Sequence, residues 1–215
     1  MVPSDPELLV LHAVRLVGFV DAPAVAERLD LPLHEVERHL ANASADGFAR
    51  HRTGARTGWS LTDEGRKENE RLLADELDRS GHRPVVEAAY RRFVDLNRRV
   101  LAICTDWQVR DVEGHVLNDH TDAEYDRAVI GRLAEADAEA TPLLAELAGS
   151  LARYAGYGPR LGRALTTIRS GDHDWFTRPT IDSYHTVWFE LHEDLLATLG
   201  LDRSSESRPT TTRGS

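Results

Sequence analysis

The chain has 215 residues, a length that fits one large domain or two small ones. Hydrophobic residues make up 41% of it and charged residues 29%, which provides material for a core and excludes disorder throughout. No apolar run approaches the roughly 20 residues of a membrane-spanning helix, and residues 1–5 do not open a signal peptide. We therefore expect a cytoplasmic protein that makes no membrane contact.

The charge and the cysteine content narrow the functional classes further. A net charge of −10 argues against a surface that binds nucleic acid over its whole extent, although a local basic patch is compatible with it. The single cysteine, Cys104, excludes an intrachain disulfide and a cysteine-based zinc finger.

Helix signals dominate the first fifty residues. Apolar repeats predict a first helix that ends at Gly18 and two more over residues 23–29 and 32–46. The pattern then changes to two short strands, residues 48–52 and 59–61, on either side of a turn with two glycines. Thr62 is placed to cap the helix that follows.

The rest of the chain has helix signals only. Residues 83–107 carry apolar side chains at alternating spacings of three and four, which predicts one long helix with a heptad seam. Thr121 and Glu124 have the spacing of a capping box, and Pro142 indicates a break or a new start within the helical region that follows. A last, strongly apolar helix is expected over residues 180–199. We expect no strand after Leu61.

The N-terminal third also carries short motifs in a fixed order. Residues 24–29 and 31–40 match the second and third helices of a helix-turn-helix, and residues 46–50 match the step into a hairpin. Residues 58–66, Gly-Trp-Ser-Leu-Thr-Asp-Glu-Gly-Arg, are similar to the W-x-L-T-x-x-G-R closing strand of MarR-like regulators. Over residues 5–75 the chain therefore resembles a MarR-like winged helix-turn-helix protein.

Together, the resemblance and the helix pattern imply a mainly α-helical protein. A winged helix-turn-helix domain, with three helices and a two-stranded wing, is expected over residues 1–78. An all-helical effector or dimerisation domain would follow over residues 79–203. Residues 204–215 are rich in Ser, Thr and Arg and have no large apolar side chain, so we expect a disordered tail.

The resemblance implies a transcriptional regulator whose third helix enters the major groove of DNA while its wing contacts the backbone. It implies DNA contacts from His34, Arg38, His39, Arg50, Arg52 and Arg56.

The charge of this region departs from the pattern, because residues 1–76 hold nine Lys and Arg against fourteen Asp and Glu. Glu35, Glu37 and Asp46 make the third helix acidic, so binding to DNA is expected to be weak, dependent on dimerisation, or absent.

The second half concentrates aromatic, histidine and acidic side chains. We expect them to form an effector or partner site in which indole rings provide apolar walls and polar groups orient a small ligand. The candidate residues are Trp107, Asn118, Asp119, His120, His173, Trp175, Asp182, His185, Trp188 and His192.

Two other interpretations of these residues stay open. Each histidine can be a satisfied core residue and each aspartate a helix cap. A metal held by several of the histidines is less favoured, because no HExxH or equivalent spacing occurs. The sequence has no phosphate-binding loop and no GxSxG motif, so we expect neither an enzyme nor a bound cofactor or metal.

The expected partners are DNA, a second copy of the chain and a small-molecule effector. The homodimer is inferred from the heptad seam, which could instead pack inside one subunit. Residues 107–126 and 182–195 also resemble helical units that accompany phosphoenolpyruvate-utilising dikinase modules in actinobacterial proteins. That resemblance implies an alternative function as an accessory module of a metabolic enzyme that binds protein and not DNA.

Overall fold

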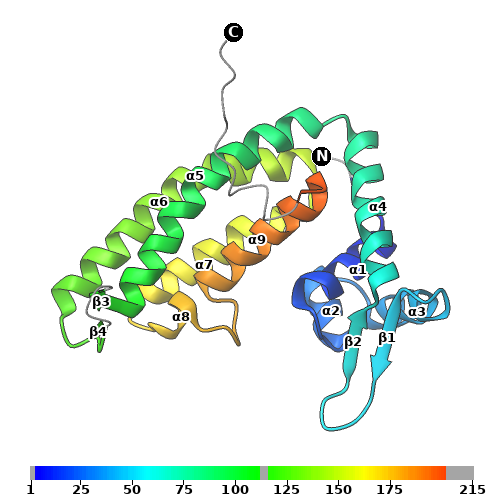
Figure 1. Ribbon diagram of the computed structural model, residues 1–215, viewed down its shortest axis with the longest axis horizontal. Coiled ribbons are helices and arrows are strands. Elements are labelled where there is room, and N and C mark those ends of the chain that lie inside the picture. Colours follow the sequence, from blue (N-terminus) through cyan, green and yellow to red (C-terminus); the bar gives the residue numbers. More distant parts are fainter. Residues whose placement is uncertain (1–2, 112–115, 202–215) are drawn as a thin grey trace. The chain divides into compact units, whose positions relative to one another are not determined.

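The computed structural model describes residues 3–111 and 116–201 (Figure 1). Contacts divide the chain into two compact units. The N-terminal unit holds residues 3–83 together with the described residues from Glu193 onward, and the helical unit holds residues 84–192. The predicted domain bounds place the whole last helix in the helical domain, whereas the part of that helix from Glu193 onward belongs to the N-terminal unit. The predicted tail, residues 204–215, lies outside the described residues.

The N-terminal unit begins with three helices, followed by a hairpin and a fourth helix. The elements are α1 (Pro6–Val17), α2 (Ala22–Leu29), α3 (Leu33–Ala45), β1 (Ala49–Arg52), β2 (Gly58–Leu61) and α4 (Asp63–Ser80). The strands are antiparallel, with Ala49 opposite Leu61 and Arg52 opposite Gly58. An isolated antiparallel bridge pairs Val20, in the segment between α1 and α2, with Trp59 of β2.

Side-chain caps define where these helices start. Asp5 accepts a hydrogen bond from the Glu7 amide before α1, and Asp21 accepts one from Ala24 before α2. Thr62 accepts from the Gly65 amide, as predicted, and its hydroxyl also donates to the Gly47 carbonyl at 2.7 Å. That second bond joins the start of α4 to the segment that leads into β1.

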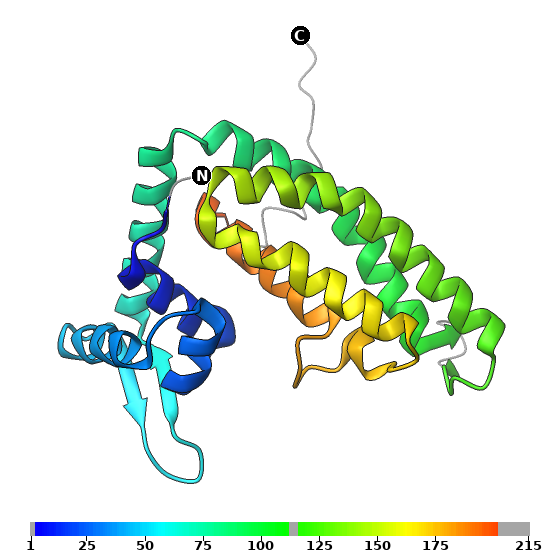
Figure 2. The same ribbon diagram turned by 180° about the vertical axis from the view of Figure 1, so that it is seen from behind.

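The helical unit consists of long helices and a short second hairpin. Its elements are α5 (Arg83–Gln108), β3 (Val109–Asp111), β4 (Val116–Leu117), α6 (Ala123–Ser150), the 3-10 turn η1 (Ala152–Gly156), α7 (Tyr157–Arg169), α8 (Asp174–Thr177) and α9 (Tyr184–Leu199). Helices α5 and α6 lie side by side in both views (Figure 1, Figure 2). The prediction of a mainly helical chain is confirmed.

The heptad seam of α5 is buried within the chain. Phe93 stacks on Trp188 with ring centroids 4.8 Å apart, and the Trp188 indole donates to the Asn97 amide oxygen at 3.0 Å. The other seam residues are at most 8% exposed: Val86, Ala89, Leu96, Val100, Ile103 and Trp107. The seam is therefore occupied inside one subunit and is not free to form a dimer interface, which removes the basis for the predicted homodimer.

An ion-pair ladder joins the exposed sides of α5 and α6. Arg92 pairs with Glu146, Arg99 with Glu139 at 2.5 Å, and Asp106 with Arg132 at 2.7 Å. Successive ion-paired residues are seven apart on each helix, and their numbers rise along α5 as they fall along α6. The two helices therefore pack antiparallel with a heptad spacing.

Three local expectations are wrong. A second sheet exists after Leu61, because β3 pairs with β4; strands of three and two residues are too short to show alternation. Pro142 lies inside the continuous helix α6, whose buried side chains continue on both sides of it. The last helix starts at Tyr184, so Asp182 precedes it. Within the described ranges, no helix is long and apolar enough to cross a membrane.

Candidate nucleic-acid interface and ligand site

The hairpin presents three arginines to solvent. Arg50 and Arg52 lie on β1 and Arg56 lies in the turn, and all three are exposed. None of them has an ion-pair partner among the residues that the structure describes. Between them His51 stacks on Trp59, with ring centroids 4.5 Å apart. Because side chains alternate along a strand, Arg50 and Arg52 share the face opposite His51.

A hollow of about 680 Å³ lies between the end of α3, the hairpin and the start of α4. Arg50 and Arg52 line it, together with the carboxylates of Asp63 and Glu64. Glu64 also pairs with Lys67 at 2.7 Å. The hollow is therefore mixed in charge, whereas the turn of the hairpin is basic.

Helix α3 has one exposed polar stripe. Its buried side is formed by Val36, Leu40 and Ala43. His34 and Arg38 are exposed and one turn apart, and His39 is half-buried with its Nε2 atom 3.3 Å from Arg38 Nη2. Asn42, also exposed, continues the stripe four residues after Arg38. Asn42 was not among the candidate residues of α3, although helical spacing from Arg38 places it on the same stripe.

Four of the residues predicted for the effector site come together at one end of the helical unit. The Trp107 ring stacks on Phe176 at 4.3 Å and lies 4.4 Å from the His120 ring. His173 meets the edge of Trp107 at 5.1 Å. Asn118 is buried beside them and donates from its amide nitrogen to the Trp107 carbonyl at 3.1 Å.

A buried carboxylate that was not among the predicted site residues organises this cluster. Asp126, 4% exposed, accepts from Asn118 Nδ2 at 2.8 Å and lies 3.0 Å from Nδ1 of His120. Because a carboxylate only accepts hydrogen bonds, this contact places the proton on Nδ1 of His120. Asp126 lies on the same helical stripe as the buried Val129, and a carboxylate on an apolar stripe is the signal that could have revealed it.

His120 has an unusual backbone conformation. Its φ of 57° lies in the left-handed region, which only one other non-glycine residue adopts in the described part of the chain, Asp30. Its amide donates to Asn118 Oδ1 at 3.2 Å, which helps to fix the turn. A histidine held in this way is oriented by the fold.

A groove of about 440 Å³ opens beside the two histidines. Its lining combines imidazole and guanidinium groups with small and apolar side chains from α6, α7 and the segment after α7. The lining residues are His120, Ala123, Asp126, Arg127, Ile130, Gly131, Ile168, Arg169, Gly171 and His173.

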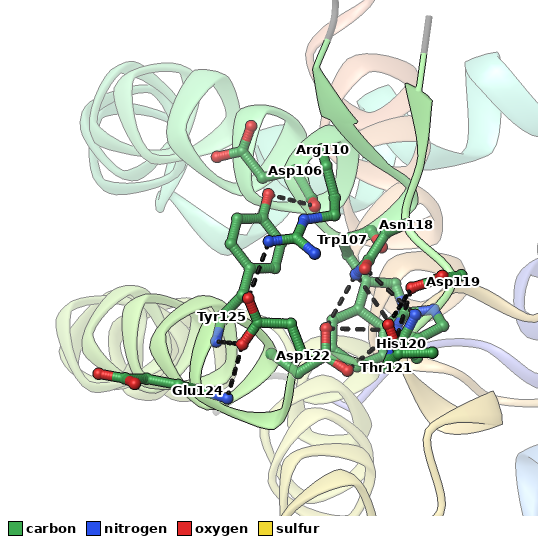
Figure 3. A network of polar contacts seen from close by, with 11 residues as sticks. Asp106, Trp107, Arg110, Asn118, Asp119, His120, Thr121, Asp122, Glu124 and Tyr125 are labelled. Atoms are coloured by element: carbon green, nitrogen blue, oxygen red, sulfur yellow. Dashed lines mark hydrogen bonds and ion pairs between the residues drawn. The ribbon is translucent and has the colours of Figure 1, made fainter.

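A second polar network surrounds the start of α6 (Figure 3). Asp122 caps the helix by accepting from the Glu124 and Tyr125 amides, and it pairs with Arg110 at 2.8 Å. The backbone bond from Tyr125 and the contact with Arg110 lower the pKa of Asp122. The expected cap, Thr121, is wrong: its hydroxyl donates to Asp119 instead, and this bond lowers the pKa of Asp119.

The remaining predicted ligand residues lie elsewhere in the helical unit. Asp182 pairs with Arg160 at 2.8 Å, and Trp175 lies under the Arg163 guanidinium. Burial lowers the pKa of the half-buried His185. Trp188 and His192 both pack against Phe93 in the core, with His192 at 5.2 Å. None of these five side chains lines the groove.

Comparison with known proteins gives no relative. No family model matches the chain, no curated protein matches it, and no solved structure matches it. Within the described ranges, no group of three or more His, Cys, Asp or Glu side chains is arranged to hold a metal ion.

Proposed function

We propose that this protein is a DNA-binding transcriptional regulator, with a winged helix-turn-helix of the MarR-like kind as its DNA-binding domain. The order of α1 to α4, with a hairpin between α3 and α4 and a bridge from Val20 to Trp59, supports this proposal. The observation that carries it is the set of three exposed arginines on the hairpin, none ion-paired within the described residues. Helix order alone would not define a function.

In this proposal the hairpin is the wing and contacts phosphates. Arg50, Arg52 and Arg56 are the phosphate-binding residues, because arginine forms strong charge-assisted hydrogen bonds to phosphate oxygens. Helix α3 would enter the major groove with His34 and Arg38 towards base edges and His39 beside Arg38. Asn42 joins this set, because an asparagine amide can pair with adenine.

The negative charge of the N-terminal region implies that each subunit alone binds DNA with modest affinity. Residues 1–76 carry a net charge of −5, and Glu37 is exposed on α3 beside Arg38. Phosphates therefore approach α3 against a repulsive field, while the wing attracts them. We propose that two copies act together on DNA, through a surface other than the buried seam of α5.

The test measures, by fluorescence anisotropy at low salt, how tightly the chain binds a labelled pool of random-sequence DNA duplexes. The wild-type chain should bind, and the triple variant Arg50→Ala, Arg52→Ala, Arg56→Ala should lose most of the affinity. Each substitution removes a charge-assisted hydrogen bond to phosphate and the counterion release that accompanies it. Arg79→Ala is the matched control, because Arg79 is exposed at the far end of α4 and its removal changes the charge as much as one hairpin substitution does.

A wild-type chain that leaves every duplex free at low salt would overturn the proposal. The same holds if Arg79→Ala alone weakens binding by one third or more of the free-energy loss seen with the triple variant. The chain would then be better described as a protein-binding accessory module of a metabolic enzyme, the alternative that its second half suggests.

A further inference from the structure

We propose that the groove beside His120 and His173 binds a small organic anion, a phosphate or carboxylate compound with a compact apolar part. The inference rests on the proposed function in one respect only: in a transcriptional regulator, this anion would be the effector. Binding of the anion itself can be tested without DNA.

The groove carries positive charge. Arg127 on α6 and Arg169 at the end of α7 both line it, and neither forms an ion pair within the described residues. Arg169 acts on the Asp137 carboxylate only at longer range. Other arginines of this unit, such as Arg99 and Arg132, are paired directly with carboxylates. The guanidinium groups of Arg127 and Arg169 together form a site for an anion, because each can donate two hydrogen bonds to it.

His120 is already oriented for a ligand. The one carboxylate among the groove-lining residues, Asp126, forms its hydrogen bonds with Asn118 and Nδ1 of His120 and makes no ion pair with either arginine within the described residues. With its proton on Nδ1, His120 has Nε2 available for a ligand. The ring contact with Trp107 and the hydrogen bond to Asp126 orient the imidazole.

The groove also has the size and the apolar lining of a small-molecule site. Its volume of about 440 Å³ lies within the range of such sites. Ile130 and Ile168 supply an apolar wall, and a Cβ atom added to Gly131 would meet no heavy atom within 4 Å. A ligand can thus place its charge at the arginines and its hydrocarbon part against the isoleucines.

The experiment is calorimetric titration of the full chain with phenyl phosphate, inorganic phosphate and uncharged benzyl alcohol. We expect phenyl phosphate to bind one to one, inorganic phosphate to bind more weakly, and benzyl alcohol to leave the chain free. Arg127→Gln and Arg169→Gln should each weaken binding of phenyl phosphate about tenfold, the effect of one charged hydrogen bond. Arg99→Gln, which removes the same charge outside the groove, should bind like the wild type.

Substitutions at Gly131 test the location without changing charge. Gly131→Leu should abolish binding by filling the groove, whereas Gly131→Ala should retain it, and circular dichroism verifies that both fold. The proposal is overturned if phenyl phosphate fails to bind at concentrations up to about 10 mM. It is equally overturned if the arginine variants bind like Arg99→Gln. If the chain binds phenyl phosphate but not DNA, the anion site stands and the proposed regulator function is wrong.

Discussion

At the scale of single residues, Gly65 shows how one atom can decide whether two elements meet. A Cβ atom at this position would lie 1.9 Å from the Phe48 carbonyl oxygen, so only glycine lets the start of α4 approach the hairpin. We predict that Gly65→Ala lowers the free energy of unfolding by about 2 kcal/mol or more, because backbone must move to relieve the overlap.

The control for this prediction is Gly131→Ala, a glycine in the interior of a helix with open space around it. That substitution should raise stability by about 0.5–1 kcal/mol. Urea denaturation of both variants measures the difference. Equal effects at the two positions would show that the close approach at Gly65 does not matter.

His185 gives a prediction about pH at the same scale. Burial lowers the pKa of His185 in the folded chain, so the unfolded chain binds a proton more readily. The neutral form is therefore favoured by folding, and this contribution is complete above the unfolded pKa of about 6.5 and is lost as the pH falls below it. His185→Gln should reduce the loss of stability between pH 7 and pH 5, as measured by thermal unfolding. A variant with undiminished acid sensitivity would contradict this.

At the scale of elements, a buried polar contact attaches the end of α9 to the N-terminal unit. Nε2 of His12, on α1, lies 3.1 Å from the Asp194 carboxylate, and its Nδ1 lies 3.2 Å from the Asn69 amide oxygen. His12 is 4% exposed and Asp194 2% exposed. Through His12 and Asn69 this contact links the segment from Glu193 onward to α1 and α4, in the same compact unit.

We predict that His12→Ala destabilises the chain by about 3 kcal/mol, because it removes the imidazole that faces a buried carboxylate. The double variant His12→Leu, Asp194→Leu should recover much of this stability, since both polar groups are then removed together. Chemical denaturation checks both. Additive effects in the double variant would mean that the two side chains act independently.

The elements also show what a sequence can and cannot reveal. Apolar spacing predicted α5 to within a residue, and the Thr62 cap was predicted correctly, because both signals are local. The ladder of α5 and α6, the contact of His12 with Asp194 and the role of Asp126 depend on which distant segments meet. Local spacing contains no such information. For the same reason, the sequence could not show which candidate ligand residues meet: His120 and His173 are neighbours, while Asp182 and His192 lie elsewhere.

At the scale of the whole molecule, the proposed function requires a chain with a net charge of −10 to bind a polyanion. We place all phosphate contacts on a basic hairpin and none on the acidic helix. Two copies with three arginines each then offer at most about six contacts, so the logarithm of the binding constant should fall with the logarithm of salt concentration with a slope no steeper than about −5.

The most direct measurement is this salt dependence for the wild-type chain and for Arg52→Ala, Arg56→Ala, using the same random duplex. We predict a measurable slope that becomes shallower by about one for each phosphate-binding arginine removed from the bound assembly, with binding to all sequences weakened alike. An unchanged slope in the double variant would contradict a wing that binds the backbone, because the phosphate contacts would then lie outside the hairpin.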